Sequence, residues 1–249
     1  MANEIVKSFS EGLTDKLVSV ESALPKDFNR ERFVQNCLAV LNEKPELTRI
    51  NAAELQAGLL KGAYLGLDFF KKECYLIPYG SKVNFQTDYK GETKFVKKYA
   101  IRPIHEIYAK IVRDGDLFEE KIIDGKPSIE FHPKPFNTGE IVGAFAVVLY
   151  KDGGMDYEVM TTQAINGVRS NYSKMSNSGA WKNSWDEMAK KTVLRRLCKH
   201  IETDFESAEA MRAWEDGSDS NIATVERSGE VVDAFSDVVA ESEYKEVEE

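Results

Sequence analysis

The hydrophobic period of this chain changes near residue 70, and that change limits what the chain can fold into. Before it, apolar residues recur at intervals of three or four, first at Leu13, Leu17, Val20 and Leu24, and then at Phe33, Val34, Cys37, Leu38 and Leu41. This spacing places each set on one face of a helix. From Glu73 onward the period becomes two, which is the pattern of strands with one buried face. Helices are therefore expected before residue 70 and strands after it.

A third helix is expected to begin at Asn51, because Glu54 three positions later completes a capping box. Gly58, Gly62 and Gly66 then recur every four residues. Glycine weakens a helix, so three on one face indicate that a backbone or a neighbouring helix approaches closely. We favour close packing within the subunit, and a contact between subunits is the alternative.

The segments 73–79 and 82–88 flank Gly80-Ser81, a pair suited to the type II′ turn of a β-hairpin. This turn sets the register and gives the hairpin two faces. One face is apolar and pairs Pro78 with Val83, Leu76 with Phe85 and Cys74 with Thr87; the other pairs Tyr79 with Lys82, Ile77 with Asn84 and Tyr75 with Gln86. Tyrosines beside a lysine and amides suit single-stranded nucleic acid, which needs stacking platforms and a cation. The solvent-facing side of an ordinary sheet is the alternative.

After the hairpin, the spacing predicts a helix near 89–99 with a basic outer side. Strands are expected at 102–113, 117–123, 128–132, 141–150 and 155–161, separated by Gly and Asp pairs. Residues 170–184 are rich in Ser, Asn and Gly and are predicted to form a long polar loop. A last helix from about Trp185 to Ile201 is expected to turn Ala189, Val193, Leu194, Leu197 and Ile201 toward the core. Its exposed stripe would be Lys191, Arg195 and Lys199, flanked by Lys190 and Arg196.

The net charge of −9 argues against nucleic-acid binding only until the charges are located. Residues 215–249 carry −10, whereas residues 1–214 carry +1, and the segments 71–113 and 163–200 carry +6 each. Two uncompensated basic segments favour a polyanionic partner. The acidic tail is expected to be largely disordered. Its apolar residues at spacings of three and four predict either a weak helix or a partner-docking motif: Val231, Val232, Phe235, Val238 and Val239.

Several classes of function find no support in the sequence. There is no GxxxxGK[ST] loop for ATP hydrolysis, and the three cysteines and three histidines form no metal-binding pattern, so we expect no cofactor and no metal. Asp88-Tyr89-Lys90 matches half of a metal-dependent nuclease motif, but it lacks a carboxylate partner, which makes a nuclease the least favoured alternative. No signal peptide and no spanning segment are seen, so a cytoplasmic protein without membrane contact is expected.

Two motifs resemble the RecT family of phage and prophage recombinases. The first comprises Leu65-Gly66-Leu67, the segment from Lys72 to Tyr79 and the segment from Phe85 to Gly91; the second is the helix with Trp185 and the run from Met188 to Leu197. The resemblance covers roughly Phe33 to Ile201 in matching order. It implies an α+β core with a DNA groove that runs along successive subunits. It also implies an ATP-independent annealing protein, not an enzyme, that coats single-stranded DNA as a homo-oligomer, in rings or helical filaments. Such a protein pairs the coated strand with a complementary strand through an annealed duplex intermediate, in phage homologous recombination. A phage exonuclease and a host single-strand-binding protein are the implied partners, and a passive single-stranded DNA coat protein is the alternative.

For DNA binding we expect a groove with two basic walls. The first wall would come from Lys71, Lys72, Lys82, Lys90, Lys94, Lys97 and Lys98, and the second from Lys190, Lys191, Arg195, Arg196 and Lys199. Tyr75, Tyr79 and Tyr89 are expected to stack on bases or sugars beside Gln86, and the 170–184 loop to close over the strand with Arg169, Lys174 and Lys182. The expected domains are an N-terminal helical region that packs subunits (1–70), a DNA-binding and annealing core (71–214) and an acidic flexible tail (215–249).

Overall fold

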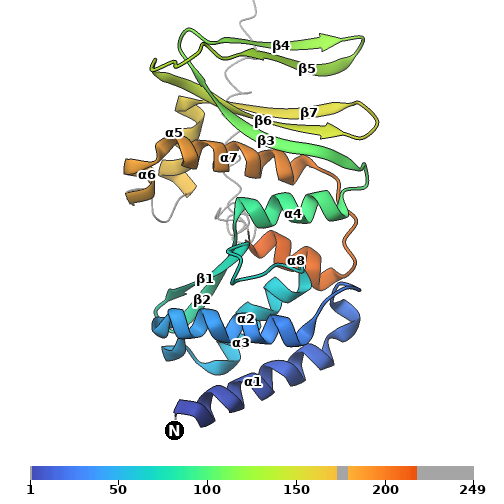
Figure 1. Cartoon of the computed structure of the whole chain (residues 1–249), viewed down its shortest axis with the longest axis vertical. Helices are drawn as coiled ribbons and strands as arrows, with labels where there is room; N and C mark the ends of the chain where they lie inside the picture. The colour runs from blue at the N-terminus through green and yellow to red at the C-terminus, as the bar shows by residue number, and fades with distance from the viewer. Residues whose placement is uncertain (1, 173–178, 218–249) are drawn as a thin grey trace, which may run out of the picture. The chain divides into compact units, whose positions relative to one another are not determined.

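Three helices and the first hairpin share one hydrophobic cluster. The computed structural model describes residues 2–172 and 179–217 (Figure 1). Its N-terminal part consists of α1 (Ala2–Ser19), α2 (Arg30–Glu43) and α3 (Ala52–Tyr64), with 3₁₀ turns at Glu21–Ala23 and Pro45–Arg49. Leu13, Leu17, Phe33, Cys37 and Leu59 are buried together in this cluster. The predicted helical faces are therefore the ones that pack, and the α+β class is confirmed.

Helix α3 begins and ends as local chemistry requires. The Asn51 side chain accepts a hydrogen bond from the backbone N–H of Ala53 at 2.8 Å, which caps the helix. The Glu54 carboxylate accepts from Val83 N at 3.4 Å, so it ties α3 to the hairpin. At the other end Gly66 has φ +63, and the N–H groups of Gly66 and Leu67 bond back to Ala63 and Gly62 in a Schellman motif.

The glycine spacing in α3 reflects close packing inside the subunit, as the sequence favoured. A Cβ at Gly58 would lie 2.9 Å from side-chain carbons of both Leu76 and Val83 of the hairpin. A Cβ at Gly62 would lie 2.5 Å from the Phe69 ring. The missing side chains thus let the hairpin and the Phe69 ring lie directly on the helix.

The predicted hairpin register is confirmed at every pair. Strands β1 (Cys74–Tyr79) and β2 (Lys82–Thr87) pair antiparallel, with Tyr79 opposite Lys82 and Cys74 opposite Thr87. Gly80 has φ +60, the conformation that the first position of a type II′ turn demands. Cys74, Leu76 and Phe85 are buried, so the apolar face is the one that packs on α3.

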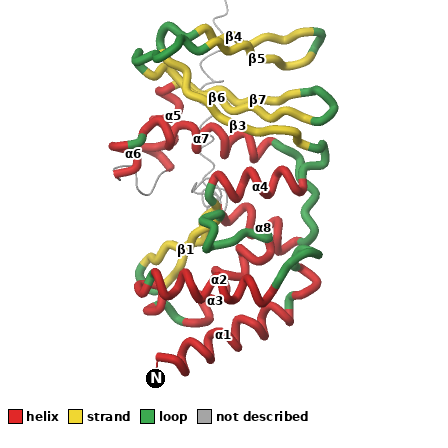
Figure 2. Tube along the Cα trace, in the orientation of Figure 1, coloured by secondary structure: helices red, strands yellow, loops and turns green. Residues whose placement is uncertain are grey.

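A three-stranded antiparallel sheet forms the second part of the core. Strands β3 (Ile104–Arg113), β6 (Ile141–Tyr150) and β7 (Met155–Thr161) pair in the order β3-β6-β7, so β3 is an edge strand. A hairpin of β4 (Leu117–Ile123) and β5 (Lys126–His132) covers one face of this sheet (Figures 1 and 2). On that face Phe145 and Val147 pack against Phe118, Ile129 and Phe131. Because both faces of β6 are covered, its apolar run is almost continuously buried.

Helices cover the other face of the sheet. They are α5 (Thr162–Tyr172) and α7 (Trp185–His200), as Figure 2 shows, and α6 (Gly179–Asn183) packs on α7. The core face predicted for α7 is confirmed, since Ala189, Val193, Leu194, Leu197 and Ile201 are all buried. They pack with Ala144, Ala146 and Val148 of β6.

Two further helices complete the described chain. Helix α4 (Tyr89–Tyr99) was predicted, whereas α8 (Ala208–Gly217) was not. Phe95 of α4 stacks on Trp214 of α8 with ring centroids 4.6 Å apart. Residues 215–217, which the sequence analysis assigned to the tail, thus belong to a helix whose Ala210 and Ala213 are buried in the N-terminal cluster.

The prediction of one long polar loop at 170–184 is wrong. Residues 170–172 end α5, and α6 forms at 179–183. Ile165 is fully buried and Trp181 is 4% exposed, so a few apolar side chains anchor these helices beneath a polar composition. The part of the loop at 173–178, with Lys174, and the tail from residue 218, with its apolar residues, lie outside the described residues.

Two glycine substitutions separate tight packing from ordinary helix propensity. A Cβ at Gly91 in α4 would lie 2.1 Å from the Glu73 carbonyl oxygen, whereas one at Gly167 in α5 would meet nothing within 4 Å. We expect Gly91→Ala to lower the free energy of unfolding by about 1–3 kcal/mol. Gly167→Ala, the matched control, should raise it by about 0.5–1 kcal/mol. Urea unfolding measures both, and equal effects would contradict the close contact at Gly91.

Candidate nucleic-acid interface

A groove of about 790 Å³ lies between α4, the edge strand β3 and α7. Two buried residues, Ile107 and Leu194, form part of its lining. The lining also includes Tyr89, Thr93, Tyr108 and Ala109. Six lysines also line it: Lys90, Lys94, Lys97 and Lys98 from α4, and Lys190 and Lys191 from α7. The fold therefore brings lysines of both basic sequence segments to one concave surface.

The groove lysines differ in how far carboxylates already neutralise them. Lys94 pairs with Glu73 at 2.7 Å, Lys98 with Asp27 at 2.5 Å and Lys190 with Glu187 at 2.5 Å. Among the described residues, no carboxylate forms an ion pair with Lys90, Lys97 or Lys191. These three carry the uncompensated charge of the groove.

The pair of Lys98 and Asp27 shows how the compensated lysines are held. The hydrogen bond from Lys98 lowers the pKa of Asp27, and the same contact raises the pKa of Lys98 against the opposing effect of its partial burial. Both side chains remain substantially exposed, so the pair is screened by salt and is weak. A phosphate can replace the carboxylate at modest cost.

The polar face of the β1–β2 hairpin is separate from this groove. Of the predicted stacking tyrosines, Tyr89 lines the groove, whereas Tyr75 and Tyr79 do not. Tyr75 is half-buried; Lys44 Nζ lies 5.6 Å from its ring centroid, and burial raises the pKa of its hydroxyl. Tyr79 and Lys82 are exposed and flank the turn of the hairpin, whereas Gln86 is half-buried and lies opposite Tyr75, near the open end.

The remaining predicted residues lie around the groove. Lys72 borders a small recess beside Tyr75, and Lys71 lines a second recess of about 270 Å³ that it shares with Lys94 and Lys98. Arg169 lies over the Trp181 ring at 5.4 Å, and Lys182 and Lys199 are exposed. Arg196 pairs with Glu158 of β7 at 2.7 Å.

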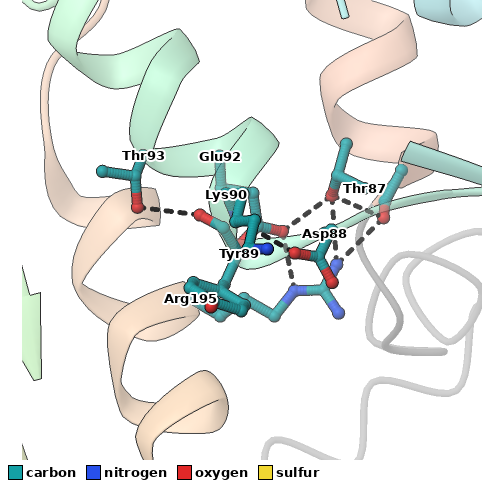
Figure 3. Close-up of polar contacts among 8 residues, drawn as sticks. Thr87, Asp88, Tyr89, Lys90, Glu92, Thr93 and Arg195 are labelled. Atoms are coloured by element: carbon teal, nitrogen blue, oxygen red, sulfur yellow. Dashed lines mark hydrogen bonds and ion pairs between the residues drawn. The ribbon is translucent and has the colours of Figure 1, made fainter. Parts of the chain in front are cut away.

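Arg195 corrects the predicted exposed stripe of α7. Its side chain is only 11% exposed, because it turns inward toward Glu92 of α4. Arg195 Nε donates to Glu92 Oε1 at 2.8 Å, and Nη2 donates to Thr87 Oγ1 at 3.2 Å (Figure 3). Nη2 also donates to the Gly217 carbonyl at 3.0 Å. The helical wheel placed Arg195 next to Lys191 correctly, but it contained no information about this distant partner.

Glu92 is the residue that the sequence analysis missed. It is 4% exposed, and its Oε1 also lies 2.7 Å from the Thr87 hydroxyl, which in turn lies 3.0 Å from the Gly217 carbonyl oxygen. Its Oε2 has no hydrogen-bond partner among the described residues. Burial raises the pKa of Glu92 even though Arg195, Thr87 and Lys191 all lower it. The available signal was a single acid among the lysines of an otherwise basic helix.

Asp88 has a structural task at the start of α4. Its side chain accepts a hydrogen bond from Lys90 N at 3.2 Å and caps the helix (Figure 3). Its own N–H donates to the Glu73 carbonyl at 2.9 Å. The acid-x-Lys triplet is thus a helix cap followed by a groove lysine. The described residues contain no group of three His, Cys, Asp or Glu side chains able to hold a metal ion.

A groove that combines lysines from two sequence segments on one α+β fold has the charge that attracts a polyanion. Similarity to known proteins identifies the family of this chain, because the model of the RecT family matches residues 31–223. The chain is also 30% identical over 229 residues to Protein RecT of Escherichia coli (strain K12), covering 83% of this chain and 81% of that protein. It is 28% identical over 175 residues to the uncharacterized protein YqaK of Bacillus subtilis (strain 168), covering 67% and 57% of the two chains. The chain belongs to the RecT family. None of its described helices is long and apolar enough to cross a membrane.

The raised pKa of Glu92 predicts a specific pH dependence. Folded protein binds this proton more tightly than unfolded chain, so wild type loses stability as the pH rises from the ordinary glutamate pKa, about 4.3, through the folded pKa. Glu92→Gln cannot lose such a proton. We expect the difference in Tm between wild type and Glu92→Gln to move in favour of the variant as the pH rises through this window. Glu202→Gln, which removes an exposed carboxylate, is the control. A difference that is constant with pH, or moves toward wild type, would contradict the assignment.

Proposed function

We propose that this protein is a single-strand annealing protein of homologous recombination that holds single-stranded DNA in the groove between α4, β3 and α7. The observation that carries the proposal is the convergence there of six lysines from the two basic segments, three of them without a carboxylate partner among the described residues. Membership in the RecT family supports the same activity.

The chemistry of the groove suits a strand held by its backbone. Lysine ammonium groups attract phosphates at any sequence and release condensed counterions, which gives affinity with steep salt dependence. Tyr89 offers one ring for stacking, and a stacked base contributes about 1–3 kcal/mol. Such binding leaves the pairing edges of the bases available, which annealing requires.

The wider set of predicted DNA-binding residues extends this proposal along the surface. The path would continue on one side of the groove over Lys71, Lys72, Tyr75, Tyr79, Lys82 and Gln86, and on the other over Arg169, Lys182, Arg196 and Lys199. Lys174, which lies outside the described residues, remains an expected DNA-binding residue. We further propose that the protein acts without ATP and coats DNA as a homo-oligomer, in rings or filaments. Residues 1–70 would pack subunits, 71–214 would bind and anneal DNA, and the acidic tail would recruit partners such as a phage exonuclease or a host single-strand-binding protein.

Removal of the uncompensated groove charge is the direct test. In Lys90→Gln/Lys97→Gln/Lys191→Gln, we expect the slope of log Kd against log salt for an oligonucleotide to flatten by about 2, because each lost phosphate contact removes about 0.7. The matched control, Lys126→Gln/Lys134→Gln/Lys151→Gln, changes the same net charge at exposed lysines outside the groove. Fluorescence anisotropy measures both slopes, and an equal loss in the two variants would show that the groove is not the binding site.

A second measurement separates annealing from its alternatives. We expect the wild-type protein to accelerate the pairing of complementary oligonucleotides without nucleotide, while labelled single strands keep their length in Mg²⁺. A passive coat protein would bind but slow the pairing, and a nuclease would shorten the strands. Either of those results would replace the proposed function.

A further inference from the structure

We infer that Arg195 and Glu92 position the two helical walls of the DNA groove, and that Arg195 does not contact the phosphate backbone. This inference rests on the proposed function, since the groove it concerns is the proposed DNA site. From its charge and its position beside Lys191 alone, Arg195 would be expected to bind a phosphate, and the inference replaces that expectation.

The guanidinium of Arg195 donates its hydrogen bonds to groups of the protein itself. Nε and Nη2 donate to oxygens of Glu92, Thr87 and Gly217, which belong to α4, the end of β2 and the end of α8. The side chains of Arg195 and Glu92 are 11% and 5% exposed. A planar fork with several donors can satisfy these oxygens together, whereas a lysine ammonium has no such geometry.

The same two helices carry the groove lysines on adjacent turns. Lys191 lies one turn before Arg195 on α7, so the two share a helix face. On α4, Glu92 is buried between Lys90 and Lys94, which line the groove. A change in the contact between Glu92 and Arg195 therefore moves the lysines on both walls.

Because the pair is buried, replacement of one member and replacement of both members should have different effects, which gives the inference a test. A charge left alone in the interior is strongly unfavourable, whereas removal of both charges together is often nearly neutral. The oxygen Oε2 of Glu92, which has no partner among the described residues, makes the apolar double replacement still milder. The bond between Thr87 and the Gly217 carbonyl does not depend on either charge.

The experiment is a double-mutant cycle of Glu92→Met, Arg195→Met and the double variant, read as affinity for a labelled oligothymidylate well below the unfolding temperatures. We expect each single variant to bind at least fivefold more weakly than wild type, and the double variant to return to within about threefold of it. Glu92→Met is decisive, because loss of an acid near a basic groove would by charge alone increase affinity. Lys191→Met, the same replacement on the groove side, should weaken binding with a much smaller change in Tm than Arg195→Met, because Lys191 interacts with Glu92 only through its charge.

Tighter binding by Glu92→Met, or a double variant as weak as Arg195→Met, would overturn the inference and make Arg195 a phosphate contact. If Arg195→Met does not fold, the Glu92→Met variant still tests the loss of affinity and the double variant still tests its recovery. If wild type itself does not bind single strands, the proposed function fails, whereas the cycle in Tm still reports whether the two residues are coupled.

Discussion

The buried ion pair between Glu92 and Arg195 is the contact on which the arrangement of the core depends. It joins residues 103 positions apart and draws β2, α4, α7 and the end of α8 to one point. Burial of either charge alone is costly, and each charge offsets part of the desolvation cost of the other. The two sequence motifs that resemble the RecT family each contribute to this point, Thr87 from the first and Arg195 from the second, while Glu92 directly follows the first. Their co-occurrence in one chain therefore has a physical reason.

From that contact the basic groove follows by helix geometry. In α4 the buried side consists of Gly91, Glu92, Phe95 and Val96, so the lysines must project from the opposite side. In α7 the apolar residues fix Val193 and Leu197 against the sheet, and Lys190 and Lys191 turn toward α4. The groove is thus the surface left between two amphipathic helices beside the edge strand β3, and its charge is a consequence of their core packing.

How much of this could be predicted depended on the range of the interaction involved. The hairpin register was predictable because Gly80 alone determines the turn, and the core face of α7 because periodicity is local. The position of Arg195 was not, since its partner is far away in sequence and the helical wheel shows only neighbours. Composition misled at 170–184, where single buried residues such as Trp181 outweigh many polar ones. Lys44 over Tyr75 likewise joins elements that no local pattern connects.

The basic residues of this chain show why a count of charges says little about binding. Three cations repeat every four residues on α7, yet each has a different environment. Lys191 lines the groove, Arg195 lies in the interior and Lys199 is exposed at the surface. Lys191 represents the first of these environments: it lies in the groove and has no carboxylate partner among the described residues. Salt dependence of binding measures the number of such cations, because a cation already paired inside the protein releases no counterion when a phosphate arrives. The relevant quantity for this protein is therefore the uncompensated charge of the groove, to which neither the total of −9 nor the +6 of each basic segment corresponds.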